Sequence, residues 1–267
     1  MAISTLKLGE LTVSHVDDGE VRIRQRVFMP GTTKEFWDSQ PDYADAAQET
    51  AASVGGLLVE HGDRAILIDA GFGPSSGPGT PDGPFGPFHG GAMPDGLAEL
   101  GRAPASIEAV AITHLHADHV GWLWQGDRPF AHAEVLVNEE EWAHQYEHSV
   151  HQKAIDAIAP QVRTVTAGEE IFPGVTVTPM PGHTPGHTAY TITGGGRRLI
   201  AFGDALHSPA QIAHPQYSSG IDHDPQRSAE HRRALAELLA EPDTMGYGVH
   251  FGAFKFGRVV GGAWQAL

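Results

Sequence analysis

The sequence predicts an α/β protein in which two β-sheets pack face to face with helices on the outside. Segments with strand-like alternation recur along the chain and are followed by helix-type segments, in two successive rounds. With 267 residues, 40% of them hydrophobic and 19% charged, the chain can build a core and is too apolar for a disordered protein. No linker or low-complexity tail divides it, so we expect a single domain over residues 1–267.

Short paired strands are predicted at the N-terminal end. Thr5–Leu8 and Leu11–Val16 alternate apolar and polar residues, and Asp17-Asp18-Gly19 is typical of a turn that would end the second strand. Val54–Glu60 and Ala65–Ile68 predict a further hairpin.

A long stretch rich in glycine and proline follows, over Gly71–Gly91. A structureless segment of this length inside a folded chain is typical of a functional loop or lid, with a disordered surface excursion as the alternative. Its aromatic residues Phe72, Phe85 and Phe88 favour a loop that lines a pocket.

The remaining elements alternate between strands and helices. Helices are predicted over Pro94–Gly101, from the capping residue Asn138 onward, and from Asp224-Pro225 to about Ala240. The remaining strands are predicted at Ile107–Thr113, Glu134–Val137, Val162–Thr166, Val175–Thr178, Ala189–Thr193, Leu199–Phe202, Met245–His250 and Gly257–Val260.

Charge and composition exclude several classes of function. The chain carries 17 lysine and arginine residues against 33 aspartate and glutamate residues, a formal net charge of −16 that opposes binding to nucleic acid or anionic membranes. No apolar run approaches the roughly 18 residues of a membrane-spanning helix. Met1–Glu10 lacks the apolar segment of a signal peptide, so we expect a cytoplasmic protein. There is no cysteine, but there are 17 histidines, which suggests a metal site built from imidazole and carboxylate ligands.

The densest group of ligand-type side chains lies in the segment Thr113–His119, at the end of a predicted buried strand. His114 and His116 alternate and would project to one side of an extended backbone, whereas the adjacent Asp118 and His119 could serve a second ion if the chain turns there. Zinc takes about four ligands, so more must come from elsewhere.

Three further strand ends can supply them. His183 lies in the loop Pro181–His187, which glycine and proline hold in a fixed shape; Asp204 follows the predicted strand Leu199–Phe202, and His250 is the last residue of the predicted strand Met245–His250. The candidate metal ligands are therefore seven, the number that two ions need when each has three terminal ligands and one carboxylate bridges them: His114, His116, Asp118, His119, His183, Asp204 and His250.

The pattern His-x-His-x-Asp-His, followed by a distant His, Asp and His, resembles that of the metallo-β-lactamase superfamily. The resemblance extends from Leu57-Leu58-Val59 to His250 and implies an αββα sandwich of two mixed β-sheets flanked by helices. It also implies two divalent metal ions, with zinc expected first and manganese, cobalt or iron as alternatives. His114, His116 and His183 would hold one ion, Asp118, His119 and His250 the other, and Asp204 would bridge them.

Further segments resemble the methyl parathion hydrolase and quorum-quenching lactonase branch of this superfamily. These are Gly203–His207, Ile212–Pro215, Asp222–Pro225 and Arg232-Arg233. Many small acyl-homoserine lactonases have tyrosine three residues after the bridging aspartate. This chain has His207 there, which favours the parathion-hydrolase-like branch. The resemblance implies a metal-dependent hydrolase of lactones, esters or organophosphate triesters.

The mechanism that the resemblance implies uses a hydroxide bridging the two metal ions as the nucleophile. Asp118 could accept its proton, and His207 could donate to the leaving group, with a purely structural role as the alternative for His207. Asp69 is the expected carboxylate partner of a metal-binding histidine, or else a turn cap, and His187 is expected beside the site in a supporting role.

The substrate is predicted to be small, neutral and apolar, because few cationic residues flank the ligand segments. Aromatic residues that could wall its pocket are Phe85, Phe88, Trp122, Trp124 and Trp142, with ordinary core packing as the alternative for each; Trp122 is favoured as a wall residue because it lies close to His119 in sequence. The alternatives are a glyoxalase II-like thioesterase, a β-lactamase, or a metal-binding relative without activity. The apolar N-terminal strands could support a homodimer.

Overall fold

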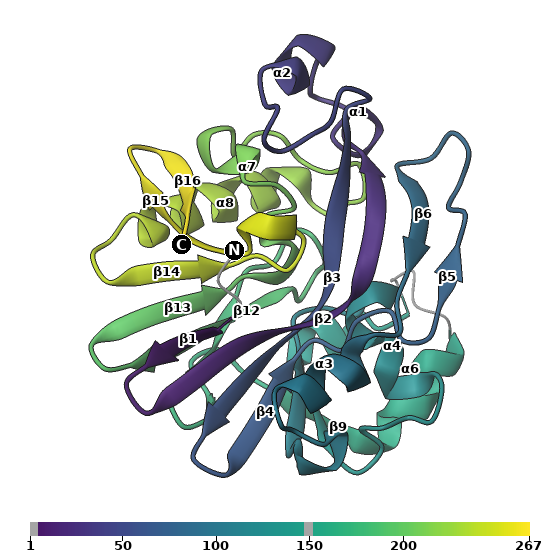
Figure 1. Ribbon diagram of the computed structural model, residues 1–267, viewed down its shortest axis with the longest axis vertical. Coiled ribbons are helices and arrows are strands. Elements are labelled where there is room, and N and C mark those ends of the chain that lie inside the picture. The colour runs from purple at the N-terminus through teal and green to yellow at the C-terminus, as the bar shows by residue number, and fades with distance from the viewer. Residues whose placement is uncertain (1–4, 147–151) are drawn as a thin grey trace.

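The computed structural model describes residues 5–146 and 152–267 and consists of two packed mixed β-sheets with helices on their outer faces (Figure 1). The nine-stranded sheet contains β5 (Ser76–Gly77), β6 (Phe85–His89), β2 (Leu11–Arg24), β3 (Glu49–His61), β4 (Arg64–Ile68), β7 (Ala109–Ile112), β8 (Glu134–Asn138) and β9 (Val162–Val165) in spatial order, with β1 (Thr5–Leu8) also paired to β2. The seven-stranded sheet contains β10 (Glu170–Phe172), β11 (Val175–Pro179), β12 (Thr188–Gly194), β13 (Arg197–Ala201), β14 (Thr244–Tyr247), β15 (Phe256–Val260) and β16 (Ala263–Ala266). This arrangement confirms the predicted fold class.

The helices that follow β3 in the chain cover these sheets from outside, whereas the two short helices between β2 and β3 lie beyond the ends of those strands (Figure 1). The helices are α1 (Gln25–Phe28), α2 (Lys34–Asp38), α3 (Met93–Glu99), α4 (Ala117–Trp124), α5 (Glu139–Ala143), α6 (Gln152–Ile158), α7 (Ala210–Ala213) and α8 (Pro225–Leu239). The predicted capping residues are confirmed: the Asn138 side chain accepts from the amide of Glu140, and Asp224 accepts from the amide of Arg227 with Pro225 in the first turn. No helix in the described part of the chain is both long and apolar enough to cross a bilayer.

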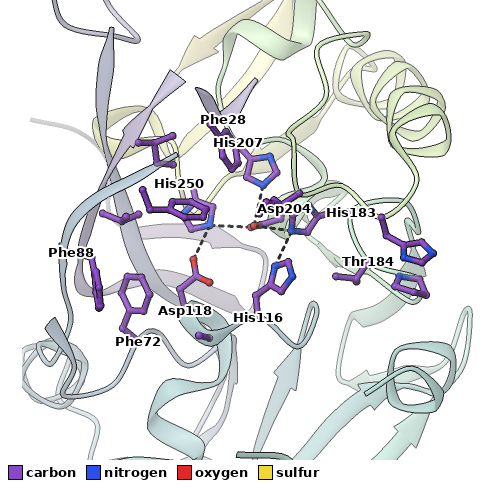
Figure 2. A pocket seen from close by; sticks show the side chains of 17 residues that line it. Phe28, Phe72, Phe88, His116, Asp118, His183, Thr184, Asp204, His207 and His250 are labelled. Atoms are coloured by element: carbon purple, nitrogen blue, oxygen red, sulfur yellow. Dashed lines mark hydrogen bonds and ion pairs between the residues drawn. The ribbon is translucent and has the colours of Figure 1, made fainter. Parts of the chain in front are cut away.

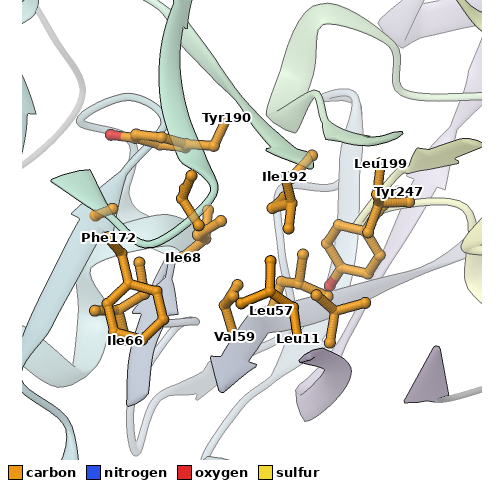
Figure 3. Close-up of a cluster of buried hydrophobic side chains, with 14 of the residues drawn as sticks. Leu11, Leu57, Val59, Ile66, Ile68, Phe172, Tyr190, Ile192, Leu199 and Tyr247 are labelled. Carbon is orange, nitrogen blue, oxygen red and sulfur yellow. The ribbon is translucent and has the colours of Figure 1, made fainter. Parts of the chain in front are cut away.

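The main core lies between the sheets. Leu57, Val59 and Ile68 from one sheet meet Tyr190 and Leu199 from the other, and all five side chains are buried (Figure 3). Because strand side chains alternate between faces, the outer faces of the sheets carry separate apolar clusters under the helices. The strand ends are therefore fixed on both sides by packing.

Two predicted features of the N-terminal half are wrong. Asp17-Asp18-Gly19 is not a turn, because β2 continues through it with a bulge that leaves Asp18 as the extra residue opposite β3. The stretch 71–91 is not structureless, because it contains the hairpin of β5 and β6, and β6 pairs with β2. The backbone of β2 and the buried Asp18 provide partners that glycine-rich sequence patterns do not reveal.

Candidate metal centre and substrate cavity

The ends of several strands place the predicted ligand residues together. β7 leads to His114 and His116, while β11, β13 and β14 lead to His183, Asp204 and His250, respectively. β11 runs in the same direction as β13 because both are antiparallel to β12, and β14 is parallel to β13. The carboxyl ends of these three strands therefore meet at one edge of their sheet, where they face the end of β7.

All seven predicted side chains come together there, in two groups whose ligand atoms lie within 4.8 Å of one another: His114, His116, His183 and Asp204; and Asp118, His119 and His250. The chain turns after His116, because α4 begins at Ala117 and carries Asp118 and His119 in its first turn. This turn separates the two halves of the motif.

The first group surrounds a point near the Asp204 carboxylate (Figure 2). His116 Nδ1 lies 2.9 Å from His114 Nε2 and 3.0 Å from His183 Nε2. Asp204 Oδ2 lies 3.4 Å from His183 Nε2 and 3.7 Å from His114 Nε2.

The second group faces the other oxygen of the same carboxylate. Asp204 Oδ1 lies 3.0 Å from His250 Nε2 and 3.2 Å from His119 Nε2. Asp118 Oδ2 lies 3.5 Å from His250 Nε2 and 3.7 Å from His119 Nε2. Each oxygen of Asp204 thus belongs to a different group of ligand atoms.

These distances fit divalent metal ions. Around a tetrahedral zinc with bonds of about 2.0–2.1 Å, neighbouring ligand atoms lie roughly 3.3 Å apart. Two atoms at the centre, His119 Nε2 and Asp204 Oδ1, are buried and have no hydrogen-bond partner. Buried polar atoms are normally paired, so orphaned atoms pointing at one another are expected where a metal ion would complete the site.

Partners on the far side of the rings orient the histidines. The Nδ1 atoms of His114, His183 and His250 lie 3.1 Å from Thr113 Oγ1, 2.8 Å from Asp222 Oδ1 and 2.9 Å from the carbonyl oxygen of Ser53, respectively. Such contacts fix the ring orientation and leave Nε2 directed at the centre. Asp222 is in turn paired with the buried Arg232 at 3.3 Å.

Asp69 orients the ring of His119 in the same way, as predicted. Its Oδ2 lies 2.9 Å from His119 Nδ1, and its Oδ1 accepts from the amide of Thr113 at 2.8 Å. Asp69 is buried and has a φ of 64°, a left-handed conformation that is uncommon outside glycine. Asp69, which directly follows β4, therefore contacts the histidine motif at both ends, at Thr113 and at His119.

His187 also has the expected supporting position. It is buried, its Nδ1 lies 3.1 Å from the carbonyl oxygen of Met180, and its Nε2 accepts from the amide of Asp204 at 3.0 Å. Burial and the nearby His183 lower the pKa of His187 to about 3, so the ring stays neutral and can hold the Asp204 backbone.

Sequence reasoning missed Glu141, which joins the two ligand-bearing loops. Its Oε1 accepts from the amide of Leu115 at 2.8 Å, and its Oε2 accepts from Thr184 Oγ1 at 2.7 Å and from the amide of Gly186 at 3.0 Å. A side chain at Gly186 would place its Cβ 1.9 Å from the amide nitrogen of Glu141. Only glycine permits this close approach.

Opposing effects of burial and charge set the pKa values at the centre. Burial disfavours protonation of His119, but Asp204, Asp69 and Asp118 outweigh it and raise its pKa well above the usual value. Burial and the neighbouring His119 lower the pKa of His114 well below the usual value. Burial of Asp204 is outweighed by His250, His119 and His207, which hold its pKa well below the usual value. Asp204 is therefore an ionised carboxylate surrounded by imidazoles.

His207 lies against this carboxylate and lines the cavity beside it. Its Nε2 is 3.1 Å from Asp204 Oδ2, its ring packs edge-on against Phe28 at 4.8 Å, and its Nδ1 is buried without a hydrogen-bond partner. Burial lowers the pKa of His207, with Asp204 opposing the effect. His207 is thus placed to orient Asp204 as well as to meet a bound molecule.

A cavity of about 570 Å³ opens over the ligand residues. Its polar side contains His116, Asp118, His183, Asp204 and His250, and no lysine or arginine lines it in the described part of the chain. Its other side is apolar, as Figure 2 shows for Phe28, Phe72 and Phe88. We call this side the apolar wall; it comprises Val21, Ile23, Phe28, Phe72, Phe85, Phe88 and Ile221.

The predicted aromatic residues divide into two sets. Phe85 and Phe88 line the cavity together with Phe72, as predicted. Trp122 does not: it lies one turn along α4 from the ligand residues, packs in the core beneath the helices and donates from Nε1 to Asp18. Trp124 and Trp142 also pack against that core and are absent from the cavity lining.

Residues 56–248 match the model of the metallo-beta-lactamase superfamily. The chain belongs to the metallo-β-lactamase superfamily. A relative from Xenopus laevis, metallo-beta-lactamase domain-containing protein 1, is 29% identical over 206 residues, which cover 77% of this chain and 75% of the relative.

Matches that cover less of the chain include named hydrolases. A probable metallo-hydrolase of Mycobacterium tuberculosis is 28% identical over 57% of this chain and 56% of its own length, and an N-acyl homoserine lactonase of a Bacillus species is 30% identical over 36% of this chain and 37% of its own. The dizinc quorum-quenching lactonase AidC has a similar structure, with a TM-score of 0.83 at 21% identity over 98% of this chain and 96% of AidC. Family and relatives place this superfamily member among the metal-dependent hydrolases.

Proposed function

We propose that this superfamily member is a dinuclear hydrolase that cleaves a small, neutral, apolar lactone, ester or organophosphate triester. The observation that carries the proposal is the Asp204 carboxylate, whose two oxygens each face a separate group of three further ligand residues. When bound, two divalent cations supply a nucleophile at neutral pH and polarise the substrate oxygen. Zinc is the first choice, and manganese, cobalt or iron suit the same histidine and aspartate ligands.

The chain's own residues would divide the remaining work. Asp118 lines the cavity and would accept the proton that the attacking water loses, while His207 would hold a proton beside the leaving oxygen. The contact between His207 and Asp204 gives His207 a second role, because it restrains the carboxylate that both groups share.

The lining of the cavity supports a neutral substrate. A substrate rich in phosphate or carboxylate groups needs cationic partners, and the described lining has no lysine or arginine. The apolar wall would take the uncharged part of the substrate by burial. This lack of cationic partners disfavours the glutathione thioesters of a glyoxalase II-like enzyme.

A panel of substrates with measured metal content tests the proposal. The purified protein should contain two divalent ions per chain and hydrolyse at least one of a p-nitrophenyl ester, a lactone and a paraoxon-type triester, and a chelator should abolish this turnover. Nitrocefin tests the β-lactamase alternative. Full metal occupancy without turnover of any neutral substrate would overturn the proposal and favour a binding protein.

A further inference from the structure

The carboxylate of Asp18 lies outside the candidate metal centre, yet it is fully buried and contacts several separate segments of the chain. Asp18 is the extra residue in the bulge of β2, which explains why its side chain points inward. The adjacent Gly19 has a φ of 149°, and a Cβ there would lie 2.0 Å from the carbonyl oxygen of His89 in β6. The bulge therefore brings β2 tightly against the end of the β5–β6 hairpin.

Four N–H donors converge on this carboxylate. Oδ2 accepts from the amide of Gly73 at 3.1 Å, and Oδ1 accepts from the amides of Gly91 and Met93, both at 3.0 Å, and from Trp122 Nε1 at 2.7 Å. The ion pairs of the described residues do not include Asp18, so these N–H groups are what compensates its buried charge.

The donors come from both ends of one segment. Gly73 precedes β5, and Gly91 follows β6, so Asp18 closes the neck of the 73–91 segment that carries Phe85 and Phe88. Val21 and Ile23 lie opposite Phe88 and Phe85 in the pairing of β2 with β6. The Asp18 carboxylate therefore fixes the position of both strands that carry Val21, Ile23, Phe85 and Phe88 of the apolar wall.

The fourth donor connects this wall to the candidate metal centre. Trp122 belongs to α4, whose first turn carries Asp118 and His119. The loop before Gly73 also follows α4 closely, because the amide of Gly121 donates to the carbonyl of Gly71 at 2.7 Å and Gln125 Nε2 donates to that of Phe72 at 3.1 Å. Wall and helix thus share one buried junction.

We propose that Asp18 is a positioning residue that fixes the apolar wall relative to Asp118 and His119, and thereby sets the length of apolar group that the cavity accepts. The inference rests on the proposed hydrolase function. It assigns Asp18 no contact with substrate or metal: the residue acts through the 73–91 segment and α4.

The test compares the wild type with Asp18→Asn. In Asp18→Asn, the side-chain oxygen can replace Oδ1 and still accept from Gly91, Met93 and Trp122. The side-chain NH₂ group then replaces Oδ2 and faces the amide N–H of Gly73, so two donors oppose one another and that hydrogen bond is lost. We expect the amide hydrogen of Gly73 to exchange faster than in the wild type. The variant should still bind two ions per chain, and its kcat for p-nitrophenyl acetate should stay within about threefold of the wild-type value. The preference for p-nitrophenyl octanoate over acetate, measured as the ratio of kcat/KM values, should fall about tenfold, which corresponds to the loss of one or two buried methylene contacts.

Two controls separate positioning from general destabilisation. Val59→Ala creates a cavity in the core between the sheets, far along β3 from the wall, and should lower thermal stability without changing the octanoate-to-acetate ratio. Trp122→Phe removes one donor and leaves the three amides, so it should shift the ratio in the same direction by a smaller factor. It also provides the test if Asp18→Asn does not fold.

Titration with 1-octanol, which cannot be hydrolysed, separates this inference from the proposed function. About tenfold weaker binding of 1-octanol to Asp18→Asn supports the inference even if the wild type hydrolyses none of the esters, in which case only the proposed function fails. If Asp18→Asn exchanges faster at Gly73 but keeps the wild-type ester ratio and the wild-type affinity for 1-octanol, the inference about Asp18 is overturned. Equal loss of activity on both esters together with loss of metal would also overturn it, since Asp18 would then serve the fold alone.

Discussion

The two sides of the cavity are built in different ways. On the ligand side, five histidines and two aspartates lie just beyond the ends of strands or in the first turn of α4, and ring nitrogens are oriented by hydrogen bonds to acceptor oxygens of Asp69, Asp222 and Ser53. On the apolar wall, residues from β2, α1, the 71–91 segment and the loop before α8 meet through packing, with the ring centroids of Phe72 and Phe88 5.0 Å apart. The metal-binding rings are thus held by their own hydrogen bonds, whereas the wall is held by hydrogen bonds at its base, on Asp18, and its side chains meet by packing.

Removing the shared carboxylate should have the largest effect. Asp204→Asn leaves the size of the side chain unchanged but removes the charge that faces both groups of ligand atoms. We expect loss of both metal ions and a fall in kcat/KM of at least about 10³-fold, because the variant loses several kcal/mol of transition-state stabilisation. Metal analysis and steady-state kinetics measure this, with the exposed Asp63→Asn as control. An Asp204→Asn protein that keeps two ions and full activity would rule out the bridging role.

The ligand side could be predicted from the sequence because most of its residues stand in one short motif. Four ligand-type residues within Thr113–His119 restrict the chemistry before any fold is known, and the other three ligand candidates follow strands with clear alternation. Glu141 could not be foreseen. It follows Glu139 and Glu140 directly, and nothing in the sequence distinguishes the buried acid from its two exposed neighbours.

The apolar wall was foreseen only in part. Phe72, Phe85 and Phe88 were placed correctly because aromatic residues in a glycine-rich loop need a surface to cover. The β5–β6 hairpin was missed because glycine and proline are unfavourable in strands, and pairing with the distant β2 overrides that preference. The single domain, the cytoplasmic location and the homodimer stay predictions.

Loosening the ligand side without removing a ligand residue should have the next largest effect. Glu141→Gln replaces one acceptor oxygen by a donor that faces N–H or O–H groups of the two ligand-bearing loops. We expect a loss of about 1–3 kcal/mol in the free energy of unfolding and a 10- to 100-fold (order-of-magnitude) weaker metal affinity. Thermal melts and competition with a chelator measure these effects. Glu139→Gln, an exposed acid on the same helix, is the matched control, and equal behaviour of the two variants would contradict the prediction.

Truncation of the apolar wall should have a smaller and more selective effect. Phe88→Ala removes one ring from the wall and leaves every ligand residue in place. We expect the KM for p-nitrophenyl octanoate to rise roughly tenfold with little change in metal content, since burial of a phenyl side chain contributes about 1.5–3 kcal/mol and part of it is lost. Phe36→Ala is the control, because Phe36 belongs to the same aromatic cluster but does not line the cavity. A uniform loss on acetate and octanoate would show that Phe88 supports the ligand side instead.

The smallest expected effect is a change in the pH dependence of stability, and it concerns the contact between β2, on the side of the apolar wall, and β14, on the ligand side. His15 on β2 lies with its Nδ1 2.7 Å from the hydroxyl of Tyr247 on β14, the strand that leads to His250. Burial lowers the pKa of His15, and Lys255 acts in the same direction, whereas Asp17 opposes it. The folded protein therefore takes up a proton at lower pH than the unfolded chain does, so stability is retained above the unfolded pKa of 6.5 and lost as pH falls below it.

The variant His15→Gln keeps a hydrogen-bonding group near Tyr247 but cannot titrate. Its metal ligands are those of the wild type, so acid release of metal cancels in the difference between the two proteins. Urea unfolding at neutral pH and about one unit below the unfolded pKa should show the wild type losing up to about 1.4 kcal/mol more than His15→Gln over that unit. If the difference does not change with pH, the junction between β2 and β14 does not depend on the protonation of His15. Tyr247 would still join β14 to the other sheet, because its hydroxyl donates to the carbonyl oxygen of Gly56 in β3 at 3.2 Å.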